Sequence, residues 1–438
     1  MKVTIICEYL RKNFFNYSHI LISFCLIFIV QSFSHTQPNS YIKATSNIHT
    51  ISIHNSTDSL NFPAIALGAD DYLIVSFDEM EHDLRTLHYS FRHCNANWTP
   101  SDLLDIEFFD DINKVYDNDE AQLSFNTTTD YIHYQIIAHT NGIKVSGNYY
   151  LTISDENDTE LLQLPFIVYE SLTGIQSRIT RQKQQYSATQ TISLCILHPM
   201  LHTSNAATEL KIAIWQNNYP WTLTTIENPT FVRPNELVYN NIATFEAGNE
   251  HRWADNRSLR YNGLNVSSID FFDPYYHITL NTDALTIGYY FHEDFNGIQY
   301  IEARDIHYPA QYAADYNFVH FAFRSQNIGQ VFLFGELTEM FPHPMHYDTT
   351  SQTYYANILL KQGLHSYTYV QANSEQSITT PSDYEQTVPS VALTEGCFPE
   401  TENDYYIVVY YRPMGDTSDR IVGYKKHNSK KTLNDFIR

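Results

Sequence analysis

The chain has 438 residues with a formal net charge of -23 at pH 7, and 43% of them are hydrophobic, including 34 Tyr and 26 Phe. This much apolar material fills several packed cores, which excludes an intrinsically disordered chain, and the length predicts two to four domains. The acidic balance argues against nucleic acid or an anionic membrane surface as a partner.

An apolar run near the N-terminus is the clearest local signal. The run covers residues 20–30, follows Arg11 and Lys12, and precedes the small pair Ser32 and Ser34. A basic region, a short apolar core and small residues two apart are typical of a cleaved secretory signal peptide. The run is about 11 residues long, which is short for a membrane-spanning helix. An uncleaved anchor is therefore only the alternative to a cleaved signal peptide. No later stretch reaches membrane-spanning length, and we predict an exported mature chain without a membrane span.

Five cysteines occur in the chain, and two of them, Cys7 and Cys25, lie in the predicted signal peptide. Cys94, Cys195 and Cys397 remain after cleavage. Three widely spaced cysteines form neither a disulfide framework nor a zinc pattern. The sequence leaves open whether one disulfide joins two of them or whether they are buried free thiols.

Strand-like segments recur through the first third of the chain, with no long amphipathic helix among them. Residues 87–92 alternate between an apolar and a polar face, which predicts a half-buried strand. The strand leads into a turn at 95–100 that contains Asn and Pro. Two interpretations stay open, because Trp98 either folds back as a core anchor or faces a partner together with Arg92 and Asn95.

Two groups of residues resemble metal sites. The segment from Asp78 to Asp83 carries four carboxylates after a predicted strand, but it lacks the spacing and the glycine of a calcium loop. We therefore predict a solvated hairpin loop there. His343 and His346 are the best metal candidates among the 20 histidines. The prolines beside them and the absence of nearby Cys or acidic ligands again predict a loop, so we assign no metal-binding residue.

A polar junction at 171–190 precedes a second set of strands that runs to residue 280. Between these strands, Glu250 and His251 have the chemistry of an acid and a base. The sequence places no third group to orient them, so a hydrogen-bonded loop at a sandwich corner is predicted instead. No catalytic residue and no cofactor site is assigned.

The third region begins near Tyr316, and its order of strands resembles the early-set immunoglobulin-like modules found beside starch- and glycogen-active enzymes. Sugar-binding members stack saccharides on exposed Trp, and no Trp follows Trp253. Glycan binding by Tyr in its place stays an open alternative. The last strand, at 405–411, is apolar on both faces and is therefore predicted to be central or covered.

Together these patterns predict an all-β fold of three consecutive antiparallel β-sandwich (immunoglobulin-like) modules. The predicted boundaries are a signal peptide at 1–34, an N-terminal β-sandwich at 35–170, a second β domain at 171–312, an early-set-like β-sandwich at 313–426 and a polar tail at 427–438.

Four stretches carry a more specific resemblance. They are HYSFRHCNANWTPSDLLDIEFFD (88–110), LSFNTTTDYIHYQI (123–136) with the following SGNYYL (146–151), FEAGNEHRWADNRSLR (245–260) and ENDYYIVVYYRP (402–413). In order and spacing they resemble the plug protein of the type IX secretion system of Bacteroidetes over nearly the whole mature chain. Asn97 stands where the family usually has Asp, and Trp253 stands where Phe or Tyr is expected. The family signature residues, structural or partner-facing, are Arg92, His93, Cys94, Asn95, Asn97, Trp98, Gly248, Asn249, Glu250 and Arg252.

The resemblance implies a partner subunit in the periplasm, peripherally associated with the outer membrane, and not an enzyme. It implies binding to the giant outer-membrane β-barrel translocon and associated secretion components, with the pore sealed while no cargo passes.

Three other classes of protein share features with this sequence. A secreted or periplasmic carbohydrate-binding β-sandwich protein is the alternative. A glycoside hydrolase needs paired carboxylates in a cleft, and Glu107 with Asp110 is the only tempting pair. We interpret them as the polar ends of an apolar turn at Phe108 and Phe109. A membrane barrel is rejected because the alternating segments are too few and too irregular for a lipid-facing band.

Overall fold

The computed structural model describes residues 42–81, 83–117, 121–183, 188–372 and 389–430. Within them the chain is built almost entirely from strands, which form six sheets, so the predicted all-β fold is confirmed. The predicted signal peptide and most of the predicted polar tail lie outside the described residues. None of the described helices is long and apolar enough to cross a membrane.

The sheets pack in pairs, and each pair encloses one hydrophobic core. We name the pairs modules 1, 2 and 3. Module 1 also contains the short helix α2 (Asp105–Phe108). One of its sheets has the order β1 (Lys43–Ala44), β10 (Glu160–Tyr169), β9 (Gly147–Asp155), β5 (Leu87–Cys94) and β6 (Val115–Asp117), with β3 (Ala64–Ala66) paired to β10. The other has the order β2 (Ile48–Asn55), β4 (Tyr72–Glu79), β8 (Ile132–His139) and β7 (Ala121–Leu123).

The period-two pattern decides which side chains fill the core of module 1. In β5, Tyr89 and Phe91 point into this core, opposite Ile153 and Leu151 of β9, while Arg92 is exposed. Every residue of β9 is buried, because one face lines the core and the other face, at Tyr150, packs against module 2.

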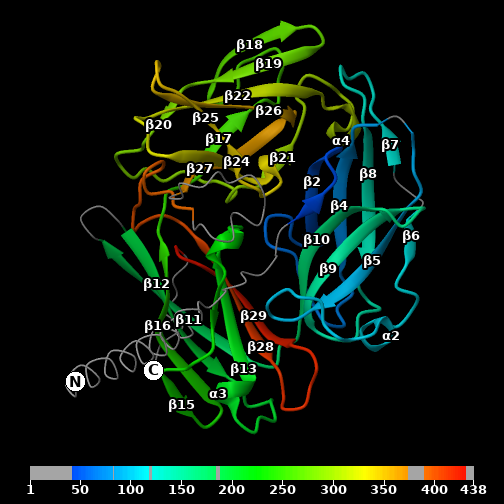
Figure 1. Cartoon of the computed structure of the whole chain (residues 1–438), viewed down its shortest axis with the longest axis vertical. Coiled ribbons are helices and arrows are strands. Elements are labelled where there is room, and N and C mark those ends of the chain that lie inside the picture. The colour runs from blue at the N-terminus through cyan, green and yellow to red at the C-terminus, as the bar shows by residue number, and fades with distance from the viewer. Residues whose placement is uncertain (1–41, 82, 118–120, 184–187, 373–388, 431–438) are drawn as a thin grey trace, which may run out of the picture. The chain divides into compact units, whose positions relative to one another are not determined.

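Module 2 is assembled from two parts of the chain that are far apart in sequence (Figure 1). One sheet has the order β11 (Gly174–Lys183), β12 (Ala188–Leu197), β16 (Glu236–Glu246) and β15 (Phe231–Arg233). The other has the order β14 (Thr224–Ile226), β13 (Leu210–Gln216), β28 (Asp404–Tyr411) and β29 (Arg420–Asn428). The short helices α3 (Ala206–Glu209) and η1 (Pro220–Thr222) flank β13.

Module 3 lies between these two parts in sequence. One sheet has the order β17 (Arg252–Asp255), β27 (Gly363–Ala372), β23 (Gln330–Phe334) and β24 (His343–Pro344), with β21 (Gln299–Ile301) on β27. The other has the order β18 (Val266–Phe272), β19 (Tyr275–Leu280), β22 (Tyr316–Arg324), β26 (Thr353–Lys361) and β25 (His346–Asp348), with β20 (Asp283–Ala284) on β22. The short helices are α4 (Ala310–Ala313) and η2 (Glu336–Thr338).

The strand pairing divides the chain differently from the predicted linear boundaries. Strands β17 to β21, expected in the second domain, pair within module 3, whereas β28 and β29, expected in the third, pair within module 2. The reason lies in β28, which is buried along its whole length. Its odd-numbered residues from Tyr405 to Tyr411 lie in the core of module 2, and Tyr406, Val408 and Tyr410 face module 1. The prediction that this strand is covered on both faces is confirmed.

Candidate functional site

The first group of signature residues forms a turn at 93–98, named here the signature turn, at the end of β5. The Asn95 N–H donates to the Thr99 carbonyl (2.8 Å), and the Trp98 N–H donates to the Asn95 carbonyl (2.8 Å). The Asn97 side chain is exposed, and its Oδ1 accepts from the Thr99 N–H (3.2 Å) and hydroxyl (2.6 Å). Trp98 has a φ of 61°, which is uncommon for a bulky residue, so these bonds hold an unusual backbone.

Polar contacts tie the signature turn to module 2. Arg412 Nη2, just after β28, donates to Asn95 Oδ1 (2.5 Å), and the Ala96 N–H donates to Asp419 Oδ2 (2.9 Å). On the module 1 side, Asn148 Nδ2 donates to the Asn95 carbonyl (2.9 Å). Asn95 is therefore a bridge between modules 1 and 2.

His93 fixes the base of the turn from inside module 1. Its Nδ1 lies 2.8 Å from Ser101 Oγ and its Nε2 lies 3.4 Å from the Ser146 carbonyl. Burial lowers the pKa of His93 to about 4, so the ring is neutral near pH 7. A Cβ at Gly147 would collide with this ring, which explains the glycine in the SGNYYL stretch.

Cys94 and Trp98 belong to the contact between modules 1 and 2, named here the aromatic junction. Trp98 is 5% exposed, and its ring centre lies 5.5 Å from that of Tyr150. In module 2, the rings of Trp215 and Tyr406 stack with their centres 5.2 Å apart. Trp98 is thus an anchor, but it anchors two modules to each other and does not lie in the core of module 1. The junction residues are Ala64, Cys94, Trp98, Tyr150, Ile167, Ala213, Trp215, Tyr406, Val408, Tyr410 and Ile421.

The second group of signature residues lies at 248–252, where the chain crosses from β16 of module 2 to β17 of module 3. We name this segment the signature crossover. Gly248 has a φ of +62°, which favours glycine, and its carbonyl accepts from the Phe398 N–H (2.9 Å) and the Thr401 hydroxyl (2.7 Å). The Gly248 N–H points at Cys397 Sγ (3.3 Å). These partners belong to the segment at 389–403, where the chain returns from module 3 to module 2.

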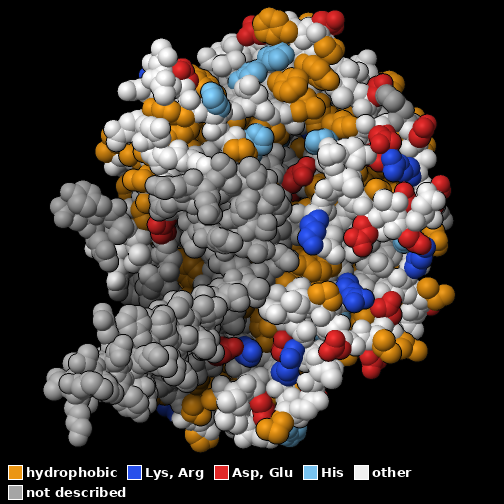
Figure 2. Space-filling model, in the orientation of Figure 1, with side chains coloured by type: hydrophobic (Ala, Val, Ile, Leu, Met, Phe, Trp, Pro, Cys, Tyr) orange, Lys and Arg blue, Asp and Glu red, His pale blue; other side chains and the backbone are white. Residues whose placement is uncertain are grey.

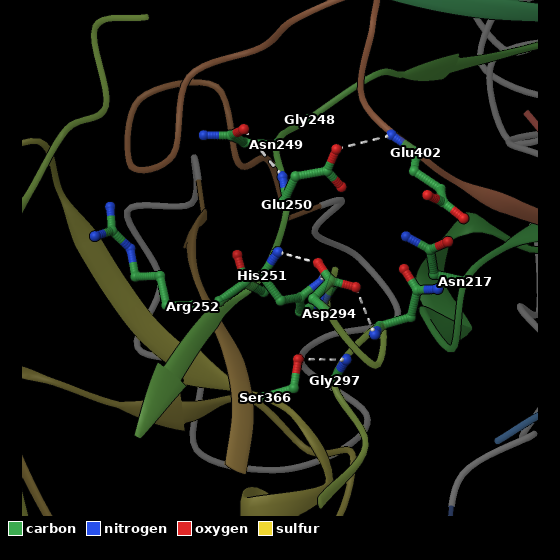
Figure 3. Close-up of polar contacts among 12 residues, drawn as sticks. Asn217, Gly248, Asn249, Glu250, His251, Arg252, Asp294, Gly297, Ser366 and Glu402 are labelled. Atoms are coloured by element: carbon green, nitrogen blue, oxygen red, sulfur yellow. Dashed lines mark hydrogen bonds and ion pairs between the residues drawn. The ribbon is translucent and has the colours of Figure 1, made fainter. Parts of the chain in front are cut away.

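Asn249 and Glu250 continue this contact with the returning segment. Asn249 Nδ2 donates to the Glu395 carbonyl (3.0 Å), and its Oδ1 accepts from the Glu250 N–H (3.0 Å). Figure 3 shows Glu250 reaching the Glu402 N–H, which donates to Glu250 Oε1 (3.3 Å). The Tyr289 hydroxyl donates to the same oxygen (2.5 Å). Burial raises the pKa of Glu250.

His251 has an orienting group that the sequence did not predict. The Asp294 carboxylate accepts a hydrogen bond from the His251 N–H and lies 3.3 Å from Nδ1, while the Tyr219 hydroxyl lies 2.8 Å from Nε2 (Figure 3 shows Asp294 beside His251). The expectation that no third group orients His251 is therefore wrong. The His251 and Asp294 side chains are only 2% and 6% exposed. The hydrogen-bonded side chains of Tyr219, His251 and Asp294 are buried and join modules 2 and 3.

Arg252 is the charged centre of the crossover. Its Nε donates to Glu395 Oε2 (2.8 Å), its Nη1 to Asp283 Oδ1 (3.0 Å) and its Nη2 to the Ala284 carbonyl (2.8 Å). The guanidinium also lies 5.6 Å from the centre of the Tyr369 ring. Burial opposes the charge, but Glu395 and Asp283 raise the pKa of Arg252, so it stays ionised.

A third contact, between modules 1 and 3, contains a buried ion pair. We name it the ionic junction. Lys361 Nζ donates to Asp78 Oδ2 (2.6 Å), and the two side chains are 1% and 0% exposed. His133 Nδ1 lies 2.7 Å from Asp78 Oδ1, and the Tyr316 hydroxyl donates to Asp78 Oδ2 (2.7 Å). Lys361 also lies 4.2 Å from the centre of the Tyr131 ring.

Asp78 contradicts the predicted solvated loop. Strand β4 continues through Glu79, and both acidic residues are 0% exposed. Burial favours the protonated acid, but Lys361 and His133 hold the pKa of Asp78 below its ordinary value. The alternation of side chains along β4 was the available signal for where Asp78 points. Val75 and Phe77 fill the core of module 1, so Asp78 falls on the opposite face, which module 3 covers.

The three described cysteines are free thiols. In the described part of the chain, Cys94, Cys195 and Cys397 form no disulfide, and no group of three metal-ligating side chains comes together. Burial raises the pKa of Cys94 to about 12 and that of Cys195 to about 11, so neither thiol is an activated nucleophile.

The tempting carboxylate pair also has a structural place. Glu107 and Asp110 are both exposed, while Phe108 and Phe109 between them are buried. Glu107 Oε2 accepts from the Leu104 N–H (2.7 Å) at the start of α2, and Asp110 lies 3.3 Å from Lys144 Nζ. This arrangement agrees with polar ends around an apolar turn.

Comparisons with known proteins agree with the resemblance. Residues 48–170 match the family model described as "Type 9 secretion system plug protein 1st domain", which confirms the similarity to the plug family. The chain is also similar to the crystal structure of a hypothetical protein from Parabacteroides merdae ATCC 43184, with a TM-score of 0.81 and 29% sequence identity. That alignment covers 89% of this chain and 99% of the other. No curated protein matches the chain.

Proposed function

We propose that this chain is a plug subunit of the type IX secretion system. It binds the giant outer-membrane β-barrel of the translocon, together with associated secretion components, and seals its periplasmic opening while no cargo passes. The observation that carries the proposal is the match of residues 48–170 to the first plug domain, since it covers module 1 from β2 to β10. The predicted signal peptide is consistent with export and with a periplasmic location at the outer membrane.

The way the modules are joined supports this role. The aromatic junction, the signature crossover and the ionic junction connect each module to both of the others. A body held in this way resists deformation, because packed interiors and satisfied buried polar groups rearrange only at a large cost in free energy. Such a body obstructs a wide lumen better than a flexible segment does.

The family match and the all-β fold suggest a non-catalytic structural protein. The site residues argue in the same direction. His251 is buried between modules 2 and 3, and Arg252 is half-buried against module 3 and the returning segment. The polar atoms of both side chains are bonded to protein groups. We propose that the signature residues maintain the junctions and that other, exposed residues contact the translocon.

Exposed apolar side chains offer material for that contact. Phe271 and Phe272 at the end of β18 are 53% and 64% exposed, and Ile106 in α2 and Ile112 after it are each 76% exposed. Figure 2 shows apolar side chains gathered at the surface of module 3 near β18 and β19. Aromatic and aliphatic residues of this kind commonly dominate the energetics of interfaces.

The test is a mild-detergent pull-down of the tagged chain from the outer membrane of its host, with the bound proteins identified by mass spectrometry. A photo-crosslinking residue at Phe272 or at Ile106 would map the contact, with the exposed Glu156 as the matched control. Recovery of a giant barrel, and a rise in its conductance when this subunit is removed, is the expected result.

A chain that comes out alone and is retained on polysaccharide would overturn the plug proposal in favour of the carbohydrate-binding alternative. No specific observation favours that alternative. Trp98, Trp215 and Trp221 are buried and Trp253 is partly buried, so no fully exposed Trp is available for stacking on sugars.

A further inference from the structure

A cavity of about 570 Å³ lies where the three modules meet. Module 1 contributes Phe62 and Trp98 to its wall, module 2 contributes Trp215, and module 3 contributes Phe295 and Tyr300. Packed interiors contain few voids larger than a water molecule, whereas sites for small molecules span about 300–1,000 Å³. Its volume is therefore that of a binding site and far exceeds an ordinary packing defect.

Two polar atoms in the wall, one oxygen of Glu336 and Nε2 of His133, lack a hydrogen-bond partner among the described residues. Glu336 Oε2 accepts from the Gln299 N–H (2.8 Å), but no protein group bonds its other oxygen. His133 is 8% exposed and its Nε2 has no hydrogen-bond partner. Asp78 Oδ1 lies 2.7 Å from His133 Nδ1 and is placed to accept its proton as a hydrogen bond, so in a neutral ring Nε2 is an acceptor.

The charges in the wall point to the sign of a ligand. Among the described residues that line the cavity, Lys361 is the only Lys or Arg, and it is already paired with Asp78. Glu336 has no such partner, and burial raises its pKa to about 7. A ligand cation would stabilise its carboxylate, whereas an anion would meet an acidic group without a free cation. The aromatic rings of the wall also attract a cation through their faces.

We propose that this cavity binds a monocationic amine with an apolar, aromatic body, whose ammonium group donates to Glu336. A free amine and a lysine side chain of a bound peptide share this chemistry. This binding site goes beyond the proposed plugging role, and the translocon pull-down can succeed or fail independently of it.

The first arm of the test uses three fluorescent probes on the full chain at pH 7.5: 2-(1-naphthyl)ethylamine, its N-acetyl derivative and 3-(1-naphthyl)propionate. These share the naphthyl body and differ in charge. We expect the amine to bind about tenfold or more tightly than the neutral probe, with the anion weakest, since a tenfold preference is the size of one modest charge-assisted contact. Equal binding of all three probes would overturn the proposal. If none of the three binds, the peptide of the second arm decides.

The second arm uses the peptide acetyl-Phe-Lys-Phe-amide and its acetyl-lysine form. Binding of the lysine form alone assigns the site to a peptide side chain, and binding of the naphthyl amine alone assigns it to a free amine. Failure of both cationic probes would overturn the proposal.

Variants then locate the binding. Glu336→Gln keeps the volume and removes the charge, so the preference for the cation should fall to less than about threefold, while Glu156→Gln on the exposed surface should leave it unchanged. Leu223→Trp fills the cavity and should abolish binding, with Leu264→Trp as the exposed control. If Leu223→Trp does not fold, Ser59→Trp tests the same point from the exposed rim. Binding that survives both filling variants, or a charge preference that survives Glu336→Gln, would place the probes elsewhere and sink the idea.

Discussion

The aromatic junction and the ionic junction hold module 1 in chemically opposite ways. At the aromatic junction, Trp98 and Tyr150 pack against Trp215 and Tyr406, and stability depends on buried apolar area. At the ionic junction, the buried carboxylate of Asp78 depends on its ion pair with Lys361. Apolar contacts weaken in proportion to the area removed, whereas a buried ion pair fails when either partner is lost. Substitutions should therefore weaken the aromatic junction gradually, whereas the loss of either charged partner should weaken the ionic junction abruptly.

Replacement of Lys361 should separate the junctions most clearly. Lys361→Met leaves Asp78 buried without its cation, and we expect the free energy of unfolding to fall by about 3–5 kcal/mol. The measurement is urea denaturation followed by tryptophan fluorescence. The double variant Asp78→Asn with Lys361→Met should recover part of the loss, because no charge is then left unpaired. A loss below about 1 kcal/mol in the single variant would show that the pair is dispensable.

Truncation at the aromatic junction should have the next largest effect. Trp98→Ala removes a side chain that is 5% exposed, and we expect a loss of about 3 kcal/mol, with a smaller loss for Trp98→Phe. The same unfolding assay measures it, and Arg92→Ala on the exposed face of the preceding strand is the control, expected within about 0.5 kcal/mol. If Trp98→Ala matched this control, Trp98 would serve only a partner and not the junction.

A pH titration tests buried acidic residues that have no cation partner as close as Lys361. Glu336 and Glu339 lie in and directly after η2, which packs against β2. Burial raises the pKa of Glu336 and of Glu339 to about 7, so the folded chain binds more protons than the unfolded chain between about pH 4.5 and 7. This contribution to stability is complete below pH 4.5 and is lost as the pH rises through 7. We expect Glu336→Gln to remove about 1–3 kcal/mol of the pH-dependent change, measured as unfolding at pH 5 and pH 8. Parallel pH profiles for both proteins would contradict the assignment.

The signature crossover should respond less to a conservative change. Arg252→Lys keeps the charge but cannot reproduce three donors in a planar fork, so we expect a loss of about 1–2 kcal/mol. Faster amide exchange in residues 390–398 should accompany it, because Glu395 fastens that segment to Arg252. Arg233→Lys, at an exposed ion pair, is the matched control. Unchanged exchange at 390–398 would show that the segment is held without the guanidinium.

The smallest effect is expected at Asn97, where the family usually has Asp. Asn97 is exposed, and its Oδ1 accepts two hydrogen bonds from Thr99 that a carboxylate accepts equally well. Asn97→Asp should therefore change the free energy of unfolding by less than about 0.5 kcal/mol. A larger effect on translocon recovery than on stability would mean that a charge at this position serves the partner.

The periodicity of the sequence predicted the buried faces of strands, because these depend on residues that are close together in the chain. The alternation at 87–92 gave the buried face of β5, and the doubly apolar run at 405–411 gave a strand covered on both sides. Asp78 was misread because its burial depends on Lys361, which lies 283 residues further along the chain. The same limit applies to Asp294, which lies 43 residues from His251 in sequence and meets it only in the fold.

Strand β28 pairs with β13 and β29 pairs with β28, and this late addition has a consequence for the order in which the modules are completed. Module 1 is complete once β10 has emerged, and module 3 once β27 has emerged, but module 2 lacks half of one sheet until residues 404–428 arrive. Until then the apolar faces of β12, β13 and β16 have no permanent cover, and long-range closure of this kind is slow. Module 3 lies in sequence between the two parts of module 2, so it must fold, or be kept soluble, while module 2 is still incomplete. A nascent chain arrested before β28 should expose module 2 to chaperones or proteases, although modules 1 and 3 are already native.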